Sequence, residues 1–220
     1  MILHTKISNF KFRSDCPTVT KVINIKCPNC GAAVDTSQQT CQYCGQPVTI
    51  STFSSAYAMP APQLNKYANA YRQALSESPD NQNLNSSLAI IYWRLKLYDK
   101  ALALFEKAME DNFDNSEIFF FAAICWLKGQ KAFLAPRNAI DLAETYLNAA
   151  ISIEPRGVYY YFQAYIKYDY FSRKSLITSP TYQQALAMAN QSGVSQFDID
   201  QLFAEMLCVA KPDAMSVNFN

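Results

Sequence analysis

Residues 85–113 constrain the fold more than any other stretch of the chain. Small and large apolar residues recur there at helical spacing, at Ala89, Tyr92, Ala101, Phe105 and Ala108. Intervals of three and four residues place such positions on one face of a helix. Small side chains let two helix backbones approach closely, and the large ones fill the space between them. The stretch therefore predicts two short antiparallel helices, with a turn at residues 97–99, that need further helices to cover them.

This spacing resembles the tetratricopeptide repeat (TPR), a helical hairpin with a period of about 34 residues. The period recurs, because Ala123 lies 34 residues after Ala89. Ala143, which corresponds to Ala101, lies 42 residues after it, and the excess of eight residues falls in the loop at 129–138. Insertions in stacked repeats fall in loops on one edge, so the phase predicts a second repeat with a longer loop.

Helical patterns continue on both sides of these two units. Residues 63–78 form a helix before the first unit, a third unit starts near Val158, and a helix at 181–191 completes it. A final helix at 198–209, N-capped by Asp198, is expected to cover the last repeat. The resemblance and the patterns together predict a mostly α-helical fold, a short TPR-like α-solenoid of antiparallel helix pairs.

Four cysteines before the helices form two CxxC pairs that are ten residues apart: Cys27, Cys30, Cys41 and Cys44. Two residues between thiolates let one tight turn present both sulfurs to one ion. Gly31 and Gly45 follow the pairs and accept the positive φ that such turns need. Four thiolates that leave no open position form a structural site for one Zn²⁺ ion. The pattern resembles the zinc ribbon family and so implies a small β module; a redox dithiol or an iron centre is the competing interpretation.

Composition divides the chain into segments. The stretch STFSSAYAMPAP after the ribbon is small, polar and ends in proline, which is typical of a mobile linker. The expected organisation is an N-terminal arm (1–26), a zinc ribbon (27–50), a linker (51–62), a TPR-like helical domain (63–210) and a frayed tail (211–220). With two separate modules, removal of the metal is expected to unfold the ribbon alone.

The N-terminal arm is the basic part of an otherwise balanced chain. The chain has 19 Lys and Arg against 18 Asp and Glu, and residues 27–50 contain no Lys or Arg. Contacts to phosphates need cations, so the ribbon itself argues against a nucleic-acid partner. We expect strands that extend the ribbon, with solvated cations. The alternative function is a nucleic-acid-associated factor that uses the ribbon together with the cations of the arm: Lys6, Lys11, Arg13, Lys21 and Lys26.

Several functional classes find little support in the sequence. His4 is the single histidine and only five glycines are present, which argues against a catalytic Ser/His or Cys/His pair and against a glycine-rich phosphate loop. We therefore expect that the protein is not an enzyme. No apolar run is long enough to span a membrane, and residues 1–15 lack the apolar core of a secretory signal. The cysteine pattern suits a reducing compartment, so we expect a cytoplasmic protein.

The resemblance also places a candidate partner surface. In stacked repeats the first helix of each pair lines the concave face, and the family's clamp for a peptide carboxylate uses Lys, Asn and Arg there. This chain has mainly apolar residues at those positions, so that clamp is absent. The expected partner-binding residues are Ser86, Ile90, Trp93, Phe120, Ile124, Leu127, Phe162, Ile166 and Asp169.

Two aromatic runs, at 119–121 and 159–162, leave open what covers this face. A helix with consecutive aromatic residues is apolar all round and is covered on both sides. One side meets the repeat core, and the other meets a partner, a second copy of the chain or the chain's own insertions. The expected function is a protein–protein interaction adaptor or assembly subunit that binds an apolar helix or peptide, with the ribbon docked elsewhere on the same assembly.

Overall fold

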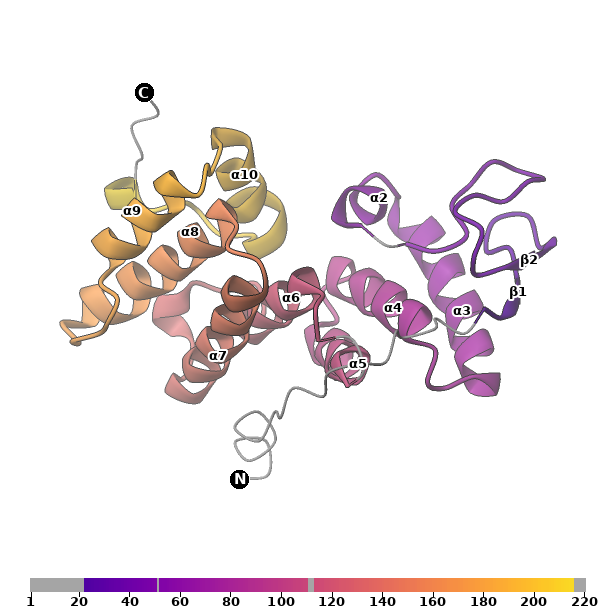
Figure 1. Ribbon diagram of the computed structural model, residues 1–220, viewed down its shortest axis with the longest axis horizontal. Coiled ribbons are helices and arrows are strands. Elements are labelled where there is room, and N and C mark those ends of the chain that lie inside the picture. The colour runs from indigo at the N-terminus through magenta and orange to yellow at the C-terminus, as the bar shows by residue number, and fades with distance from the viewer. Residues whose placement is uncertain (1–21, 51, 111–112, 216–220) are drawn as a thin grey trace.

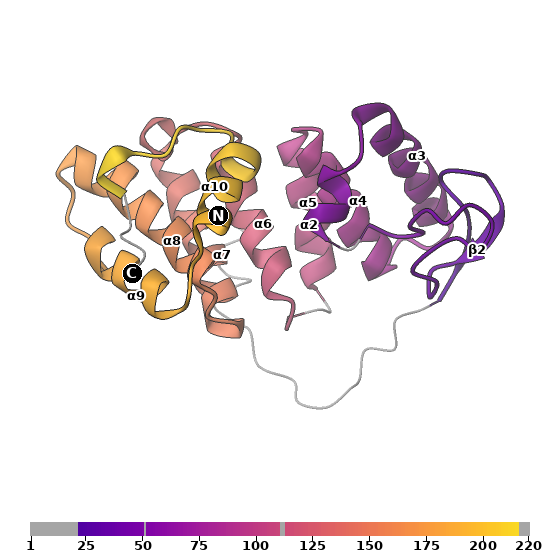
Figure 2. The ribbon, with the colours of Figure 1, turned by 90° about the horizontal axis from the view of Figure 1, so that it is seen from above.

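The computed structural model describes residues 22–50, 52–110 and 113–215. It is mostly helical, with a small two-stranded sheet at the N-terminal end (Figure 1). The expected fold class is confirmed. Helices α3 to α9 follow one another from the sheet, so that the ribbon and α9 lie at opposite ends in both views, and α10 lies back beside α8 (Figures 1 and 2).

The sheet consists of two three-residue strands, β1 (Asn24–Lys26) and β2 (Ala33–Asp35), which pair antiparallel. Ile25 lies opposite Val34, and both side chains are buried. The alternation in each strand, with one buried residue between two less buried ones, provides the small core of the ribbon.

The helices that follow pack mainly against their neighbours in the chain. Their bounds are α2 Phe53–Tyr57, α3 Ala61–Glu77, α4 Gln82–Arg94, α5 Tyr98–Met109, α6 Ser116–Leu127, α7 Arg137–Ile153, α8 Gly157–Ile166, α9 Tyr182–Gln191 and α10 Gln196–Gln201. A π-helical segment, η2 (Lys167–Phe171), continues α8, and a second one, η4 (Leu202–Leu207), continues α10. Three short 3₁₀ segments complete the described elements: η1 (Ala132–Leu134), η3 (Ser172–Lys174) and η5 (Asp213–Met215).

Side-chain caps explain where several helices begin. Asn81 and Asn115 accept hydrogen bonds from the first-turn backbone N–H groups of α4 and α6. Ser195 begins α10 with a reciprocal capping box, in which Asp198 is the third helical residue. The expected N-cap at Asp198 is therefore wrong: the helix begins three residues earlier, and the Asp198 carboxylate accepts from the Ser195 backbone N–H and hydroxyl.

The small residues of the repeat lie where the helices approach most closely. Ala89, Ala101 and Ala108 between α4 and α5 are fully buried. The corresponding Ala123 and Ala143 between α6 and α7 are also fully buried. The α5–α6 junction is filled by aromatic rings, among them Phe105 and Phe121, whose centroids lie 6.0 Å apart in a stacked arrangement.

The segment expected to be a linker differs from that expectation. Residues 53–57 form α2, and Ala56 and Met59 are buried. The Arg94 guanidinium of α4 lies 4.6 Å from the centroid of the Tyr57 ring, so α2 contacts α4. The tail differs in the same way, because Met215 is fully buried. Apolar residues in short segments between polar ones gave no helical period, which is why the sequence did not predict this packing.

One continuous core runs from the ribbon to the C-terminal segment. The Tyr67 hydroxyl of α3 donates to the Pro47 carbonyl over 2.8 Å, and the Tyr71 hydroxyl donates to the Val48 carbonyl over 2.8 Å. Both tyrosines are fully buried. The ribbon is thus packed onto the first long helix rather than held on a free tether.

Candidate metal centre and partner-binding surface

The two CxxC turns have the same backbone geometry. The Gly31 N–H donates to the Cys27 carbonyl over 2.9 Å, and the Gly45 N–H donates to the Cys41 carbonyl over 2.8 Å. Gly31 and Gly45 have φ values of +79° and +69°, a conformation that side-chain-bearing residues rarely adopt. Each turn therefore presents two sulfurs from one short loop, and the loops face each other.

The sulfur atoms have the spacing of a tetrahedral metal site. The Cys27 and Cys44 sulfurs are 3.7 Å apart, the Cys30 and Cys41 sulfurs are 3.7 Å apart, and all four lie within 4.8 Å of one another. Four sulfurs at about 2.3 Å from one tetrahedral Zn²⁺ would lie about 3.8 Å apart. The four cysteines thus fit a metal ion, and the geometry agrees with the set predicted from the spacing.

The pKa values of the clustered thiols also favour binding of a cation. A backbone hydrogen bond from Gln46 lowers the pKa of the Cys44 thiol to about 6. At Cys30 a backbone hydrogen bond from Ala32 lowers the pKa, but burial and the neighbouring thiols raise it by more, to about 12. Four sulfurs this close cannot all ionise without a positive charge between them, and a bound metal would displace the remaining protons.

The expected partner-binding residues lie on the first helices of the repeat pairs, but they are not exposed. Eight of the nine side chains are buried, and Ser86 is half-buried: the exposed fractions are at most 6 % for Ile90, Trp93, Phe120, Ile124, Leu127, Phe162, Ile166 and Asp169. A groove lined by these residues is therefore not an open surface of the molecule. This corrects the expected exposure of the concave face.

The chain's own C-terminal helix covers part of this face. Phe203 of η4 packs edge-to-face on Tyr165 and Tyr161 of α8, with ring centroids 5.2 and 6.2 Å apart. Met206 of η4 and Cys208, which follows η4, line a cavity of about 20 Å³ together with Trp93 near the end of α4. Helix α10 with η4 therefore lies across the first helices of several repeats, as a terminal cap does.

The insertion at 129–138 is held by Asp169. The Phe133 N–H donates to the Asp169 carboxylate over 2.8 Å, and Arg173 contacts the other carboxylate oxygen at 2.5 Å. The Tyr165 hydroxyl accepts from the Ala132 N–H over 3.1 Å. Asp169, expected at a partner surface, is instead a buried anchor for the loop that interrupts the repeat.

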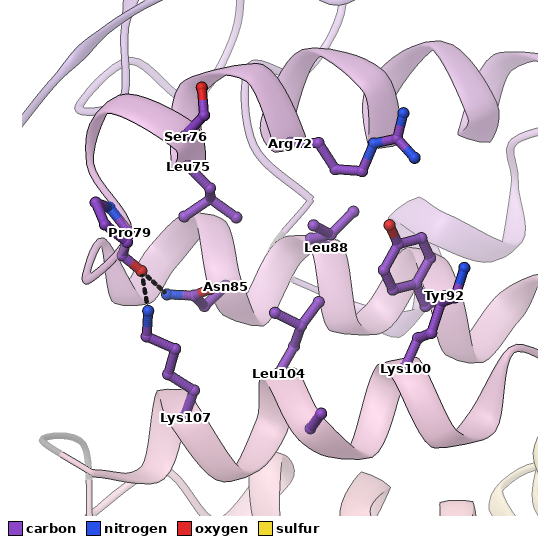
Figure 3. A pocket seen from close by; sticks show the side chains of 11 residues that line it. Arg72, Leu75, Ser76, Pro79, Asn85, Leu88, Tyr92, Lys100, Leu104 and Lys107 are labelled. Atoms are coloured by element: carbon purple, nitrogen blue, oxygen red, sulfur yellow. Dashed lines mark hydrogen bonds between the residues drawn. The ribbon is translucent and has the colours of Figure 1, made fainter.

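An open groove lies between α3, α4 and α5 (Figure 3). It has a volume of about 520 Å³. Leu88 of α4 is buried in its floor, and Leu75 of α3 and Leu104 of α5 form half-buried sides. The carbonyl of Pro79 lies at one end, where it accepts from the Asn85 side chain over 3.0 Å and from Lys107.

Comparison with protein-family models matches two parts of the chain. A zinc-ribbon domain matches residues 23–48, and a tetratricopeptide repeat matches residues 68–123. The chain carries a zinc ribbon followed by a TPR repeat. No curated protein matches the chain. The TPR match covers α4 and α5 and most of α3, the three helices that form the groove, and the zinc-ribbon match covers all four cysteines.

The groove of the TPR repeat was not predicted, although the sequence contains a signal for it. Its residues on α5 are spaced i, i+3, i+4 and i+7, and three residues of α3 together with Pro79, just beyond the end of that helix, have the same spacing. These strips lie beside the signature positions that pack the helix pairs. A second strip of this spacing on the two helices that flank α4 indicates a surface in addition to the core. The two strips are Lys100, Ala103, Leu104 and Lys107, and Arg72, Leu75, Ser76 and Pro79.

The alternative based on the basic arm is largely outside the described residues. Of its five cations, Lys6, Lys11, Arg13 and Lys21 lie outside them, and Lys26 is exposed on β1. Separately, none of the helices in the described ranges has the length and apolarity needed to cross a bilayer.

Proposed function

We propose that the protein is a non-enzymatic adaptor or assembly subunit whose TPR region binds another protein. TPR repeats generally mediate protein–protein contacts, and the open apolar groove on the matched repeat is the observation that carries the proposal. The partner engages the face formed by α3, α4 and α5. The concave residues predicted from the sequence are filled by the chain itself and are not proposed again as the contact surface.

The zinc ribbon has a structural role in this proposal. It holds one Zn²⁺ through Cys27, Cys30, Cys41 and Cys44, supported by sulfur spacings close to those of a tetrahedral site. Its packing on α3 through Tyr67 and Tyr71 makes the metal part of the support for the groove. The cysteine pattern is the support for a reducing compartment, and the cytoplasm stays the proposed location.

Site-specific photo-crosslinking tests the adaptor proposal. A photo-reactive amino acid replaces Ala103, which is exposed in the groove, or Gln183, which is exposed on α9 as a matched control. Irradiation in the source cells is expected to trap the same protein at Ala103 in repeated experiments, and not at Gln183. The proposal is contradicted if neither position traps a protein and the chain purified from those cells carries no stoichiometric protein partner.

A further inference from the structure

The groove between α3, α4 and α5 is lined by positively charged side chains as well as by an apolar floor. Every charged residue that lines it is a cation: Arg72, Lys100 and Lys107. The three come from two different helices: Arg72 on α3 and Lys100 on α5 lie at the end near Tyr92, and Lys107 on α5 lies at the end near Pro79 (Figure 3). The whole chain has nearly equal numbers of cations and anions, so this arrangement is a local concentration of positive charge.

Two of these cations have no anionic partner within the described part of the chain. Lys107 forms an ion pair with Asp80 at 3.1 Å. Arg72 donates to the neutral Asn69 side chain over 3.0 Å, and the Lys100 ammonium lies 5.8 Å from the Tyr92 ring centroid. Neither Arg72 nor Lys100 forms an ion pair with a described residue. The end of the groove near Tyr92 is therefore the more positive one.

The walls of the groove also restrict the conformation of an occupant. All three walls are helices, whose backbone groups bond within each helix, so the groove offers no strand edge to an extended peptide. The Pro79 carbonyl already accepts two hydrogen bonds. A helix satisfies its own backbone groups and needs only side-chain contacts, as helix-in-groove complexes do.

The groove has the length of a short helical contact. From Asn85 to Tyr92 it follows α4 for seven residue-to-residue steps, which is about 10 Å at 1.5 Å per step. Two turns of a partner helix match this length and place apolar side chains at i, i+3 or i+4, and i+7 over Leu75, Leu88 and Leu104.

From these observations we propose that the groove binds an amphipathic helix of a partner protein, with an apolar stripe over the three leucines and acidic side chains beside Arg72 and Lys100. The proposal rests on the adaptor function and names the chemistry of its partner. Acidic residues on the partner are attracted to the uncompensated cations, and cationic helices are repelled.

Synthetic helical peptides serve as the probe. One carries a leucine stripe with glutamates on both flanks, a second has lysines in place of the glutamates, and a third has the composition of the first in an order without a stripe. Binding is measured by fluorescence anisotropy and located by NMR shifts of the leucine methyl groups. The acidic probe is expected to bind most tightly and to shift the methyl resonances of Leu75 and Leu104. Its affinity is expected to fall as the salt concentration is raised.

A charge-reversal pair provides the sharper comparison. R72E/K100E is expected to lower the affinity for the acidic probe at least about tenfold and to raise the affinity for the lysine probe. K66E/K131E makes the same change in net charge at two exposed residues outside the groove, and it is expected to leave both affinities within about twofold. All four positions are exposed, so circular dichroism is expected to show an unchanged fold.

The proposal is overturned if the acidic probe binds no better than the peptide without a stripe, or if R72E/K100E leaves its affinity unchanged. It is also overturned if analytical ultracentrifugation shows a dimer that the R72E/K100E substitutions dissociate. Tighter binding of an RNA oligonucleotide than of the acidic probe in the groove would overturn it as well. Crosslinking from Ala103 separates the two proposals. If the parent protein and R72E/K100E both trap the same partner, the adaptor function is supported and the acidic-helix proposal is contradicted. If neither protein traps a partner, the adaptor function itself is contradicted.

Discussion

At the scale of single residues, two tyrosine hydroxyls join the ribbon to the repeat. Tyr67 and Tyr71 lie one helical turn apart on α3, with their rings edge-to-face and centroids 5.9 Å apart. Burial raises the pKa of Tyr67 to about 12 and raises that of Tyr71 well above its usual value. Both hydroxyls are therefore protonated donors at neutral pH, and their acceptors are the carbonyls of Pro47 and Val48 just after the second cysteine pair.

Removing one of these donors tests the attachment. Tyr71→Phe leaves the Val48 carbonyl without its hydrogen bond inside a buried contact, so the free energy of unfolding is expected to fall by about 1–3 kcal/mol. Tyr43→Phe is the matched control, because Tyr43 is 68 % exposed in the same ribbon and its loss is expected to cost less than about 0.5 kcal/mol. Equal effects of the two changes in urea unfolding would contradict a structural role for the Tyr71 bond.

A glycine at the start of α8 marks a second residue-scale constraint. A Cβ atom added at Gly157 would lie 2.5 Å from the backbone nitrogen of Val194, in the turn after α9. Backbone cannot move aside as a flexible side-chain end can. Gly157 thus sets how closely the start of α8 approaches the end of α9.

Gly157→Ala is expected to destabilise the protein by about 1–3 kcal/mol, because the clash outweighs the better helix propensity of alanine. Gln183→Ala, at an exposed position of α9, is the control and is expected to stay within about 0.5 kcal/mol of the parent. Thermal unfolding measures both. An unchanged or raised midpoint for Gly157→Ala would show that α8 and α9 are not packed as closely as described.

At the scale of elements, the C-terminal helix decides what the concave face can do. Leu202 and Leu207 of η4 are buried, together with Phe203. Phe203 contacts the rings of Tyr161 and Tyr165 on α8, and Met206 lines a small cavity together with Trp93, which the repeat pattern places on the concave face. The described part of the chain closes its own solenoid there and keeps an open groove at α3, α4 and α5.

Truncation of one ring in this helix tests the closure. Phe203→Ala is expected to lower the free energy of unfolding by about 3–5 kcal/mol, because it opens a cavity against Tyr161 and Tyr165. Phe197→Ala makes the same chemical change on α10, where the ring is 71 % exposed, and is expected to cost less than about 1 kcal/mol. Chemical denaturation compares them, and similar costs would mean that η4 does not cover the concave face.

Elements whose signals are local were predicted well from the sequence. The spacing of the cysteines predicted that the four thiols lie together, and the period of Ala89, Ala101 and Ala108 predicted the paired helices. What the sequence did not predict depends on contacts between distant segments. The packing of Phe203 on Tyr165 of α8 is one example, and the hydrogen bond from Phe133 in the insertion to Asp169 is another. Neither has a spacing that local periodicity could reveal.

At the scale of the whole molecule, the ribbon and the helices share one core rather than forming two independent modules. Tyr67 and Tyr71 lie on the buried face of α3, and their hydroxyls bond to carbonyls of the ribbon. The same helix supplies Arg72 and Leu75 to the groove. The ribbon therefore packs on the helix that forms one wall of the proposed partner site.

Hydrogen exchange of the full chain before and after chelation tests this account most directly. Loss of the metal is expected to remove protection from residues 22–50 and also from α3, while α7 and α8 keep theirs. The affinity for the acidic probe is expected to fall in parallel, since α3 forms one wall of the groove that binds it. Loss of protection confined to 22–50, with α3 and probe binding unchanged, would contradict the account and restore a ribbon that folds apart from the repeat.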